Sequence, residues 1–365
     1  MPTAAYGPQA IQLPPNYVWR SYAGGSVLRR FRGRGGADDD HFPEDWLAST
    51  VRARNGVYSQ GADEGLSRVR DALLSDVLTR ESEFWLGVTT PVCHGTGVLW
   101  KLLDAAVRLQ LQAHPDAAFA RRHLNSNAGK KECWYILATR GDAHVYLGFQ
   151  KSPDRAEWGR MIREQRTDEM LACFEKIPVH AGECFVVPAG TPHAIGAGVF
   201  MMELQEPTDW VVRCEMTNAG LRLPESACFM GLDLETCLDV FDYESITVAE
   251  VRRRWQQRPR LLNSGSGFCE EEVIAPEHHH FFRLNRLRGV GNATWSGGEL
   301  TLLVALKGDG RLMAANGKEL AVQAGETWLL PGCAAEWNWT SSGNDWEFLL
   351  AKPPLPETMP ASHNP

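Results

Sequence analysis

The feature that most limits the fold of this chain is a series of short apolar segments separated by turn residues. One series lies between residues 132 and 205, and a second lies between residues 281 and 352, with Gly, Pro or Asp around the segments. Segments of this length are short for helices and are typical of strands. Many short strands with turn signals between them predict a mainly β fold, with sheets arranged as a sandwich or a jelly-roll barrel.

Two of these segments repeat each other. Residues 181–188 and residues 324–331 both read Ala-Gly-Glu, then four strand-like residues, then Pro. A repeated strand-and-turn unit at this distance predicts two related β-barrels. The first copy continues into a pattern that resembles the second cupin box, G-x5-P-x-G-x2-H, on Gly182, Pro188, Gly190 and His193. In such a pattern the turns direct His193 back into the mouth of the barrel.

The second copy lacks the later part of the box, because Cys333 stands for the Gly and Glu336 for the His. We therefore expect two cupin-type jelly-roll barrels with additional short helices, only one of which binds metal. The predicted domains are a catalytic metal-binding cupin with helical insertions at 1–262, a degenerate barrel at 263–352 and a flexible tail at 353–365. Helical patterns are expected within 64–83, 117–128, 153–177 and 248–257, whereas 99–112 is expected to finish as a strand.

Composition limits the class of protein further. The 365 residues carry a net charge of −8, which argues against a general nucleic-acid binder. The nine cysteines are scattered without a C-x-x-C pair, a pattern that suits free thiols in a reducing cytoplasm. Neither a signal peptide nor an apolar run of membrane-spanning length is visible. We expect a cytoplasmic protein without a membrane partner, and the sequence leaves its oligomeric state open.

Four residues are candidate metal ligands. His193 stands in the box, and Gln112 and His114 alternate along one strand, so that both side chains face the same way. Pro115 ends that element, and Glu132 begins the next strand. Two imidazoles and a carboxylate suit zinc, and the Gln amide adds a neutral oxygen.

Several ordered motifs resemble type I mannose-6-phosphate isomerases. They are QAHPD at 112–116, GKKECWY at 129–135, VPAGTPHA at 187–194, and the positions of Glu203, Asp209 and Arg213 in MELQEPTDWVVR. HFPEDW at 41–46 resembles the N-terminal Glu-x-Trp segment of the family. The resemblance covers roughly residues 17–245, and ordered motifs at matching spacing carry more weight than any single one.

The resemblance implies a zinc-dependent aldose–ketose isomerase that interconverts mannose-6-phosphate and fructose-6-phosphate through an enediol. It implies one Zn²⁺ per chain, held by Gln112, His114, Glu132 and His193. It also implies that Arg213 is the catalytic arginine and that Lys130 lies in the substrate site. Glu203 is a candidate base by its motif position, or else a partner that orients a ligand. His94, His123 and His278–His280 match no motif, and we interpret them as structural or surface residues, the triple His within a strand-like segment.

Other functions remain open at this stage. The chain could be an isomerase of another sugar, or a non-catalytic sugar-binding cupin that keeps its metal. An iron dioxygenase is disfavoured, because the usual first cupin box with two closely spaced His is absent. One departure concerns the substrate: the family commonly has a Ser that helps to hold the phosphate where this chain has Gln110. This departure leaves an unphosphorylated sugar open as substrate.

Overall fold

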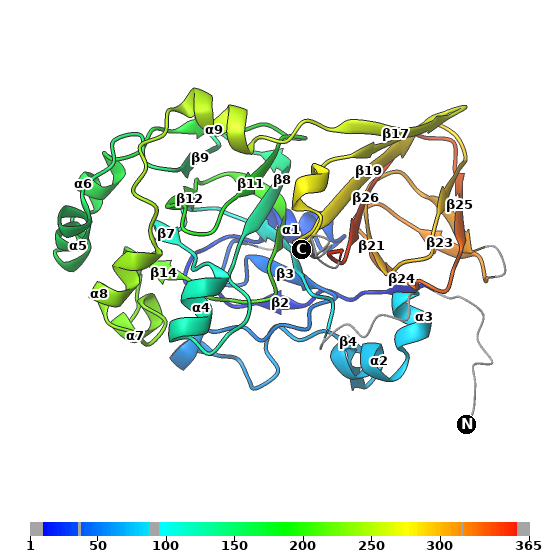
Figure 1. Cartoon of the computed structure of the whole chain (residues 1–365). Helices are drawn as coiled ribbons and strands as arrows, with labels where there is room; N and C mark the ends of the chain where they lie inside the picture. The colour runs from blue at the N-terminus through cyan, green and yellow to red at the C-terminus, as the bar shows by residue number, and fades with distance from the viewer. Residues whose placement is uncertain (1–9, 36–37, 88–94, 315–316, 356–365) are drawn as a thin grey trace, which may run out of the picture. The chain divides into compact units, whose positions relative to one another are not determined.

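The computed structural model describes residues 10–35, 38–87, 95–314 and 317–355 (Figure 1). The chain forms two compact units, each assembled from separate stretches of sequence. The large unit contains Leu13–Val77 and Leu99–Gln257, and the small unit contains Met1–Gln12, Leu78–Val98 and Arg258–Pro365. The domain limits expected from the sequence, at 262 and 352, stay a prediction.

The large unit contains two antiparallel sheets of six and five strands. The six-stranded sheet has the order β11 (Cys184–Val187), β8 (Glu132–Thr139), β13 (Val199–Gln205), β6 (Leu99–Asp104), β3 (Glu44–Leu47), β2 (Tyr17–Val18). The five-stranded sheet has the order β10 (Ile177–Pro178), β9 (His144–Leu147), β12 (His193–Ile195), β7 (Gln112–Ala113), β14 (Val212–Arg213). One buried cluster draws on both sheets, with Trp134 and Met201 from the first and Val145 and Ile195 from the second. The sheets therefore share a core.

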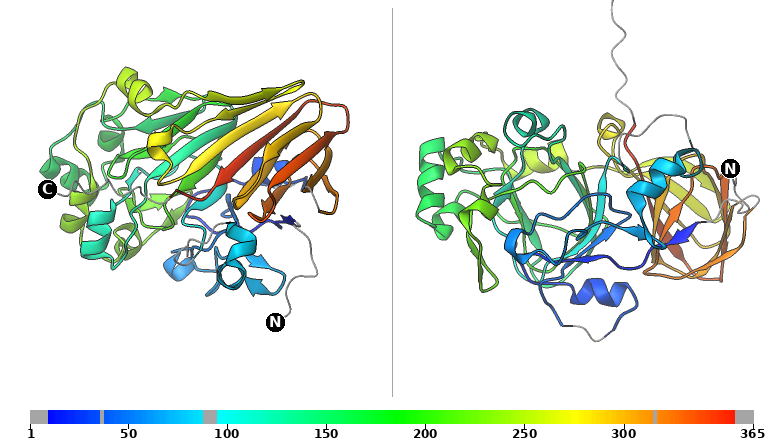
Figure 2. Two further views of the ribbon diagram at one scale, coloured as in Figure 1. Left: turned by 45° about the vertical axis from the view of Figure 1, so that its right-hand side comes forward. Right: turned by 90° about the horizontal axis from the view of Figure 1, so that it is seen from below.

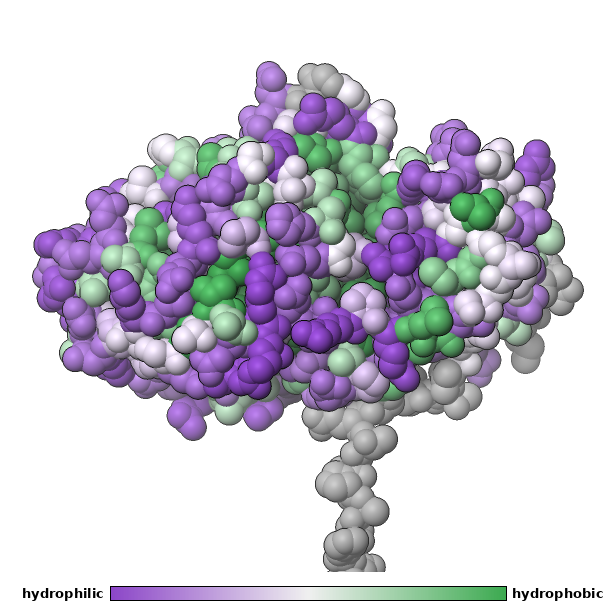
Figure 3. All heavy atoms as spheres, turned by 90° about the horizontal axis from the view of Figure 1, so that it is seen from above, coloured by the Kyte–Doolittle hydropathy of each residue, from purple (hydrophilic) through white to green (hydrophobic). Residues whose placement is uncertain are grey.

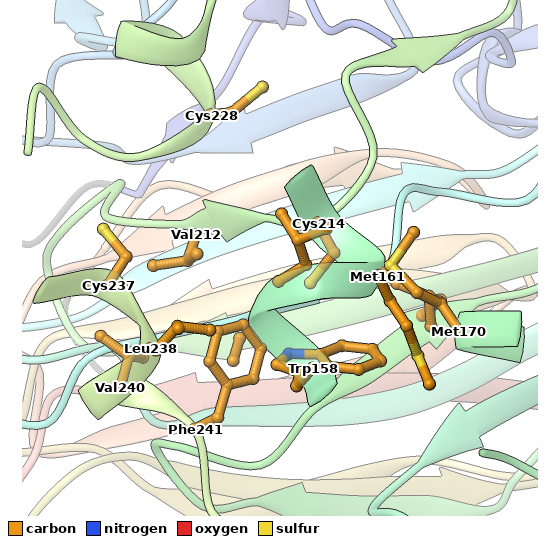
Figure 4. Packing of buried hydrophobic residues seen from close by; sticks show 14 of the residues in the cluster. Trp158, Met161, Met170, Val212, Cys214, Cys228, Cys237, Leu238, Val240 and Phe241 are labelled. Atoms are coloured by element: carbon orange, nitrogen blue, oxygen red, sulfur yellow. The ribbon is translucent and has the colours of Figure 1, made fainter. Parts of the chain in front are cut away.

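Short helices cover the outer face of the five-stranded sheet. Figure 1 shows α5 (Arg155–Arg163), α6 (Thr167–Leu171), α7 (Glu225–Cys228) and α8 (Leu234–Cys237) grouped beside this sheet. Buried side chains of these helices and of the turn that follows α8 form a second core, in which the rings of Trp158 from α5 and Phe241 from the turn have centroids 5.8 Å apart (Figure 4). Ala113, Ala194 and Val212 of the sheet belong to the same core. Because strand side chains alternate, their neighbours Gln112, His193 and Arg213 face the other way.

Local sequence explains where the remaining helices of the large unit begin. The Asp116 carboxylate accepts a hydrogen bond from the Phe119 amide at the start of α4 (Ala117–His123). Thr247 and Glu250 form a reciprocal capping box at the start of α9 (Val248–Trp255). Such caps satisfy amide groups that the helix leaves without partners. The Asp104 carboxylate does the same for α1 (Ser26–Phe31), accepting from amides of its first turn.

The small unit also contains two antiparallel sheets, and Figure 2 shows their long strands side by side in yellow to red. The first has the order β1 (Ile11–Gln12), β24 (Thr327–Leu330), β21 (Thr301–Lys307), β26 (Trp346–Lys352), β19 (Arg283–Gly289), β18 (Phe268–Glu272), β17 (Arg260–Gly265). The second has the order β20 (Ala293–Ser296), β25 (Glu336–Ser341), β22 (Gly310–Ala314), β23 (Leu320–Val322). Tryptophans fill the core, including Trp337, Trp339 and Trp346. Glu336, at the position of the box histidine, is exposed.

The mainly β fold expected from the sequence is confirmed, and so is the repeat. Gly182 and Gly325 both adopt positive φ, at 88° and 85°, and each precedes a buried strand, β11 and β24. The expected helix over 64–83 is wrong in its first half. Ser67 instead bonds the Ser49 amide, and a hairpin of β4 (Arg68–Val69) and β5 (Ala72–Leu73) turns at Arg70. Helices α2 (Leu74–Arg80) and α3 (Ser82–Leu86) follow it.

Some further expectations need correction, and others concern residues outside the described ranges. The segment 99–112 forms strand β6 at its start, since all six residues of β6 are buried between neighbouring strands. The triple His does not lie in a strand, because Pro276–His278 forms a 3-10 turn that begins at a proline. His94 and residues 356–365 of the expected tail lie outside the described residues. Within residues 353–355, the Leu355 amide donates to the His279 carbonyl.

The described surface is mixed in character. On the face shown in Figure 3, hydrophilic residues predominate and hydrophobic residues form smaller groups among them. Among the described residues, no helix combines the length and the apolar composition needed to cross a bilayer.

Candidate active site

Three buried side chains of the large unit form a group that could hold a metal ion. His114 follows β7, Glu132 begins β8 and His193 begins β12, and one ligand atom from each lies within 4.8 Å of the others. His114 Nε2 is 3.0 Å from Glu132 Oε1, and His193 Nε2 is 3.6 Å from Glu132 Oε2. All three are at most 2% exposed. It is the one such group of His, Cys, Asp and Glu found in the part of the chain that the structure describes.

Backbone carbonyls fix the two imidazoles in a metal-binding orientation. His114 Nδ1 donates to the Trp210 carbonyl at 2.8 Å, and His193 Nδ1 donates to the Thr191 carbonyl at 2.9 Å. Each Nε2 is thereby left with its lone pair directed toward Glu132. Burial lowers the pKa of His114 to about 3 and also lowers the pKa of His193. Both rings are therefore neutral at neutral pH, the form in which imidazole binds metal.

The carboxylate of Glu132 completes the donor set. Burial alone would raise its pKa, but the contact with His114 and the positive charge of Lys130 hold that pKa well below the usual range. Glu132 Oε1 is buried, and Lys130 Nζ lies 2.8 Å from it. A buried carboxylate is costly unless a cation meets it, a role that Lys130 fills here and that a bound metal ion could share. Two nitrogens and a carboxylate oxygen at this spacing fit a divalent ion such as zinc.

Gln112 lies beside this group in a different orientation from that of a ligand. It is half-buried, and its Nε2 rather than its Oε1 lies 3.2 Å from His193 Nε2. An amide nitrogen does not bind zinc, so the carboxamide must rotate by half a turn to offer its oxygen.

Lys130 and Arg213 bring positive charge to the same place. Lys130 Nζ lies 2.8 Å from Glu132 Oε1 and 3.1 Å from His114 Nε2. Arg213 pairs across the sheet with Gln112, and its Nη1 donates to the Ala227 carbonyl at 3.0 Å. Among the described residues no carboxylate lies within ion-pair distance of Arg213. Its remaining N–H groups can therefore bind an anionic oxygen.

Glu203 is held between neighbouring strands by a lysine. It faces Trp134 on β8 and Lys101 on β6, and Lys101 Nζ lies 3.0 Å from Glu203 Oε2. Burial raises the pKa of Glu203 well above its usual range, and the nearby Glu132 carboxylate adds to this. A carboxylate whose pKa is raised binds a proton more readily than an ordinary glutamate does.

A second ion-pair network forms another part of the same wall. Arg20 Nε lies 2.8 Å from Glu44, and Arg20 Nη1 lies 3.2 Å from Asp209. Glu44 also accepts hydrogen bonds from Trp46 and Tyr22. These groups line one cavity. Its lining residues are Arg20, Ser21, Tyr22, Glu44, Lys101, Leu103, Leu109, Gln110, Gln112, Lys130, Ile195, Glu203, Asp209, Val211 and Arg213.

The structure therefore brings together the residues expected from the sequence, and it adds others. Gln112, Lys130, Glu203 and Arg213 line one cavity, and Gln112 and Lys130 contact the His114, Glu132 and His193 group. The sequence analysis missed Lys101, Arg20 and Ser21. For Lys101 a signal existed, because a lysine within the apolar run 99–103 needs a buried partner. His123 lies exposed at the end of α4, and its ring is tilted by 39° against that of Phe119.

No family model matches the chain, but comparison with known proteins finds similar sequences. It is 29% identical over 257 residues to a probable mannose-6-phosphate isomerase, GmuF, of Bacillus subtilis, which covers 70% of this chain and 75% of the relative. It is 40% identical over 116 residues to a mannose-6-phosphate isomerase of Streptococcus mutans, which covers 32% of this chain and 35% of that relative.

Solved structures agree on the fold. The mannose 6-phosphate isomerase of Bacillus subtilis superposes with a TM-score of 0.73 and 19% identity, over 94% of this chain and 99% of that one. A mannose 6-phosphate isomerase with zinc and yttrium bound gives 0.69 and 13% identity, over 95% of this chain and 100% of that one. Fold and site thus define a cupin-type protein with a buried group that could hold a metal ion. In sequence and in fold the chain is similar to mannose-6-phosphate isomerases.

Proposed function

We propose that this chain is a zinc-dependent isomerase that interconverts mannose-6-phosphate and fructose-6-phosphate through an enediol. The observation that carries the proposal is the buried group of His114, Glu132 and His193, which borders a cavity with Arg213, Lys130 and Glu203. A purely structural metal site would not need three further charged residues beside it. The names of the relatives support the substrate pair.

The residues fit the metal that the family resemblance implies. His114, Glu132 and His193 would hold zinc, and Gln112 would join them through its amide oxygen after rotation. Bound zinc would act as a Lewis acid on the oxygens of the sugar. Every ligand is also hydrogen-bonded or charge-paired within the protein, which keeps the donor set in place.

The remaining residues would share the movement of a proton between C1 and C2. Arg213 offers a planar fork of N–H donors to the oxygen on which negative charge develops, and burial strengthens that interaction. The Lys130 ammonium adds charge on the side of Glu132. Glu203, whose pKa lies well above the usual range, can accept a proton from one carbon and return it to the other. Lys101 holds the Glu203 carboxyl in position at 3.0 Å.

The deciding experiment is an isomerase assay on mannose-6-phosphate with metal removed and restored. We expect a chelator to abolish turnover and stoichiometric zinc to restore it. His193→Ala should lose both zinc and turnover, whereas His123→Ala, at an exposed helix end, should keep both. Full turnover by a protein that binds no metal would refute the proposal.

A further inference from the structure

The two imidazoles of the candidate metal group differ in how far along the chain their carbonyl partners lie. His193 Nδ1 donates to the Thr191 carbonyl, which is only two residues away. His114 Nδ1 donates to the Trp210 carbonyl, which is 96 residues away. The orientation of the His193 ring is therefore fixed locally, whereas that of the His114 ring depends on what holds Trp210 in place.

Trp210 belongs to a segment without regular structure, residues 206–211, which we call the 206–211 loop. Strand β13 ends at Gln205 before the loop, and the pairing of β14 with β7 begins at Val212 after it. Strand pairing, as far as the structure describes the chain, therefore does not fix the loop. Its position has to come from bonds to neighbouring segments.

Two residues of the loop are bonded to the segment that leads into β8, on either side of Lys130. Thr208 Oγ1 donates to the Gly129 carbonyl at 2.6 Å. Glu206 Oε2 accepts from the Lys131 amide at 2.9 Å. Both bonds tie the loop to the chain that carries Lys130, and the Thr208 bond lies nearer in sequence to Trp210.

Thr208 is itself well fixed. It is 8% exposed, and its carbonyl accepts a hydrogen bond from the side chain of Gln205, which is fully buried. A buried hydroxyl that donates to a carbonyl across the chain stabilises one arrangement of both segments, because breaking the bond leaves the carbonyl without its donor.

The segment that receives the Thr208 bond lies directly against the chain that follows His114. A Cβ atom at Gly129 would come within 2.6 Å of the Pro115 carbonyl oxygen, so only glycine allows this approach. The Lys130 amide donates to the same carbonyl at 2.9 Å. Contacts therefore run from His114 through Pro115 to Gly129, and the Thr208 bond continues them to the loop whose carbonyl orients His114.

We propose that Thr208 is a positioning residue for the metal group, an inference that rests on the zinc-dependent function proposed above. Its hydroxyl holds the 206–211 loop to Gly129, and this keeps the Trp210 carbonyl within reach of His114 Nδ1. His114 Nε2 then stays directed toward Glu132, as binding of an ion between them requires. Thr208 acts through His114 and takes no part in the proton transfer.

The test measures the zinc affinity of the full chain by competition with a chelator. Thr208→Val, similar in shape but without the hydroxyl, should weaken zinc binding about 10–100-fold, the usual effect of losing a group that orients a ligand. Thr208→Ser keeps the hydroxyl and should restore most of the affinity. Thr217→Val, at an exposed position of the same unit, should bind zinc as the unaltered protein does.

Two further measurements separate positioning from a loss of stability. The melting temperature of the metal-free protein reports whether each variant is folded, and the absorption spectrum of the cobalt-loaded protein reports the arrangement of the ligands. We expect Thr208→Val to alter that spectrum and Thr208→Ser to restore it. Thr208→Ala removes the hydroxyl without placing a methyl group against the Gly129 carbonyl, and it replaces Thr208→Val if that variant does not fold.

The outcomes distinguish this inference from the proposed function. Unaltered zinc affinity and an unaltered cobalt spectrum in a folded variant without the hydroxyl would overturn the role of Thr208 and leave the proposed function standing. The same losses in Thr208→Ser as in Thr208→Val would also overturn it, because the hydroxyl would not be the group that matters. An unaltered protein that binds no zinc would overturn the proposed function and this inference with it.

Discussion

Among single residues, what separates Arg213 from the other cations of the cavity is the lack of a carboxylate partner. Arg20, Lys101 and Lys130 each lie within 3.2 Å of a carboxylate oxygen, whereas Arg213 donates to the Ala227 carbonyl through Nη1 and has no carboxylate within ion-pair distance in the described part of the chain. An unpaired guanidinium keeps its donors for substrate. Arg213 is therefore the cation from which the developing oxyanion gains most.

Arg213→Ala should lower kcat about 10²–10³-fold, as expected when a preorganised donor to an oxyanion is lost. Zinc content and the melting temperature should stay close to those of the unaltered protein, because no ion pair is broken. Arg222→Ala, an exposed position in the same unit, is the matched control. Turnover within threefold of the unaltered protein would contradict the catalytic role.

Glu44 links the charge network to stability at acid pH. Burial alone would raise its pKa, but Arg20 and Lys101 lower it far below 4.5. The unfolded chain therefore takes up a proton near pH 4.5 that the folded protein does not. The stabilising contribution is complete above that pH and is lost as the pH falls through the lower, folded pKa.

Glu44→Gln should lower the free energy of unfolding by about 3–5 kcal/mol at pH 7, since it leaves Arg20 and Lys101 short of a partner. The deficit should shrink as the pH falls below 4.5, which urea unfolding at several pH values can measure. Glu225→Gln, on an exposed helix turn, should follow the unaltered protein throughout. Parallel curves for Glu44→Gln and the unaltered protein would show that this carboxylate does not titrate as described.

Sequence patterns pointed to the residues of the candidate metal group but not to the charge network. His193 was found because a glycine and proline pattern surrounds it, and Gln112 and His114 because they alternate on one strand. Lys101, Arg20 and Ser21 come from segments far apart in sequence, and only the paired strands show that they share a cavity. Ion pairs between residues far apart in the chain produce no local periodicity, so the sequence alone does not reveal them.

At the scale of elements, the five-stranded sheet is covered by helices that pack on the face opposite the candidate metal ligands. Trp158 of α5 is fully buried against Phe149 and Phe241. The sheet contributes Ala113 and Ala194 to this core, and the small size of these residues lets the covering residues approach closely. The helical cover therefore determines the position of the strands that carry the site.

Trp158→Ala should lower the free energy of unfolding by about 3–5 kcal/mol, the usual cost of emptying a large core position. Denaturant titration of the metal-free and zinc-loaded proteins would measure it. Val57→Ala, at a position 83% exposed, should stay within about 0.5 kcal/mol. A small effect of Trp158→Ala would mean that this core does not stabilise the sheet.

The short strands could be predicted because turn residues stand at both of their ends. The structure of the first half of 64–83 could not be predicted in this way. The spacing of Leu and Val there is helical, yet the Ser67 hydroxyl bonds the Ser49 amide and Arg70 adopts a φ of 56°. Tertiary hydrogen bonds overrode a local pattern, which sequence periodicity cannot register.

At the scale of the whole molecule, the two copies of the repeat share their architecture but not their chemistry. Gly182 and Gly325 make the same turn before equivalent strands, but only the first copy continues to a histidine. In the small unit the corresponding Glu336 is exposed, while Trp337 and Trp339 are buried in the core. The interior of the small unit is apolar at the place that corresponds to the polar candidate site of the large unit.

We therefore predict one zinc ion per chain, measured by elemental analysis of the purified protein. Glu336→Ala should leave that value at one, whereas Glu132→Gln should reduce it to a small fraction, because the amide offers no negative charge. Zinc should also raise the melting temperature of the unaltered protein through binding to the folded state. A second tightly bound zinc that disappears in Glu336→Ala would contradict this assignment.

The alternation of side chains along residues 110–114 has a consequence for how this protein can change over time. Gln110 and Gln112 line the cavity and His114 belongs to the candidate metal group, while Leu111 and Ala113 face the helical core. Substitutions can vary each face separately, and the choice of sugar can drift at Gln110 without disturbing the metal. Deleting one residue from this stretch would exchange the two faces, placing polar groups in the core and apolar groups in the cavity. Substrate preference can therefore change in this stretch through substitutions, but not through insertions or deletions.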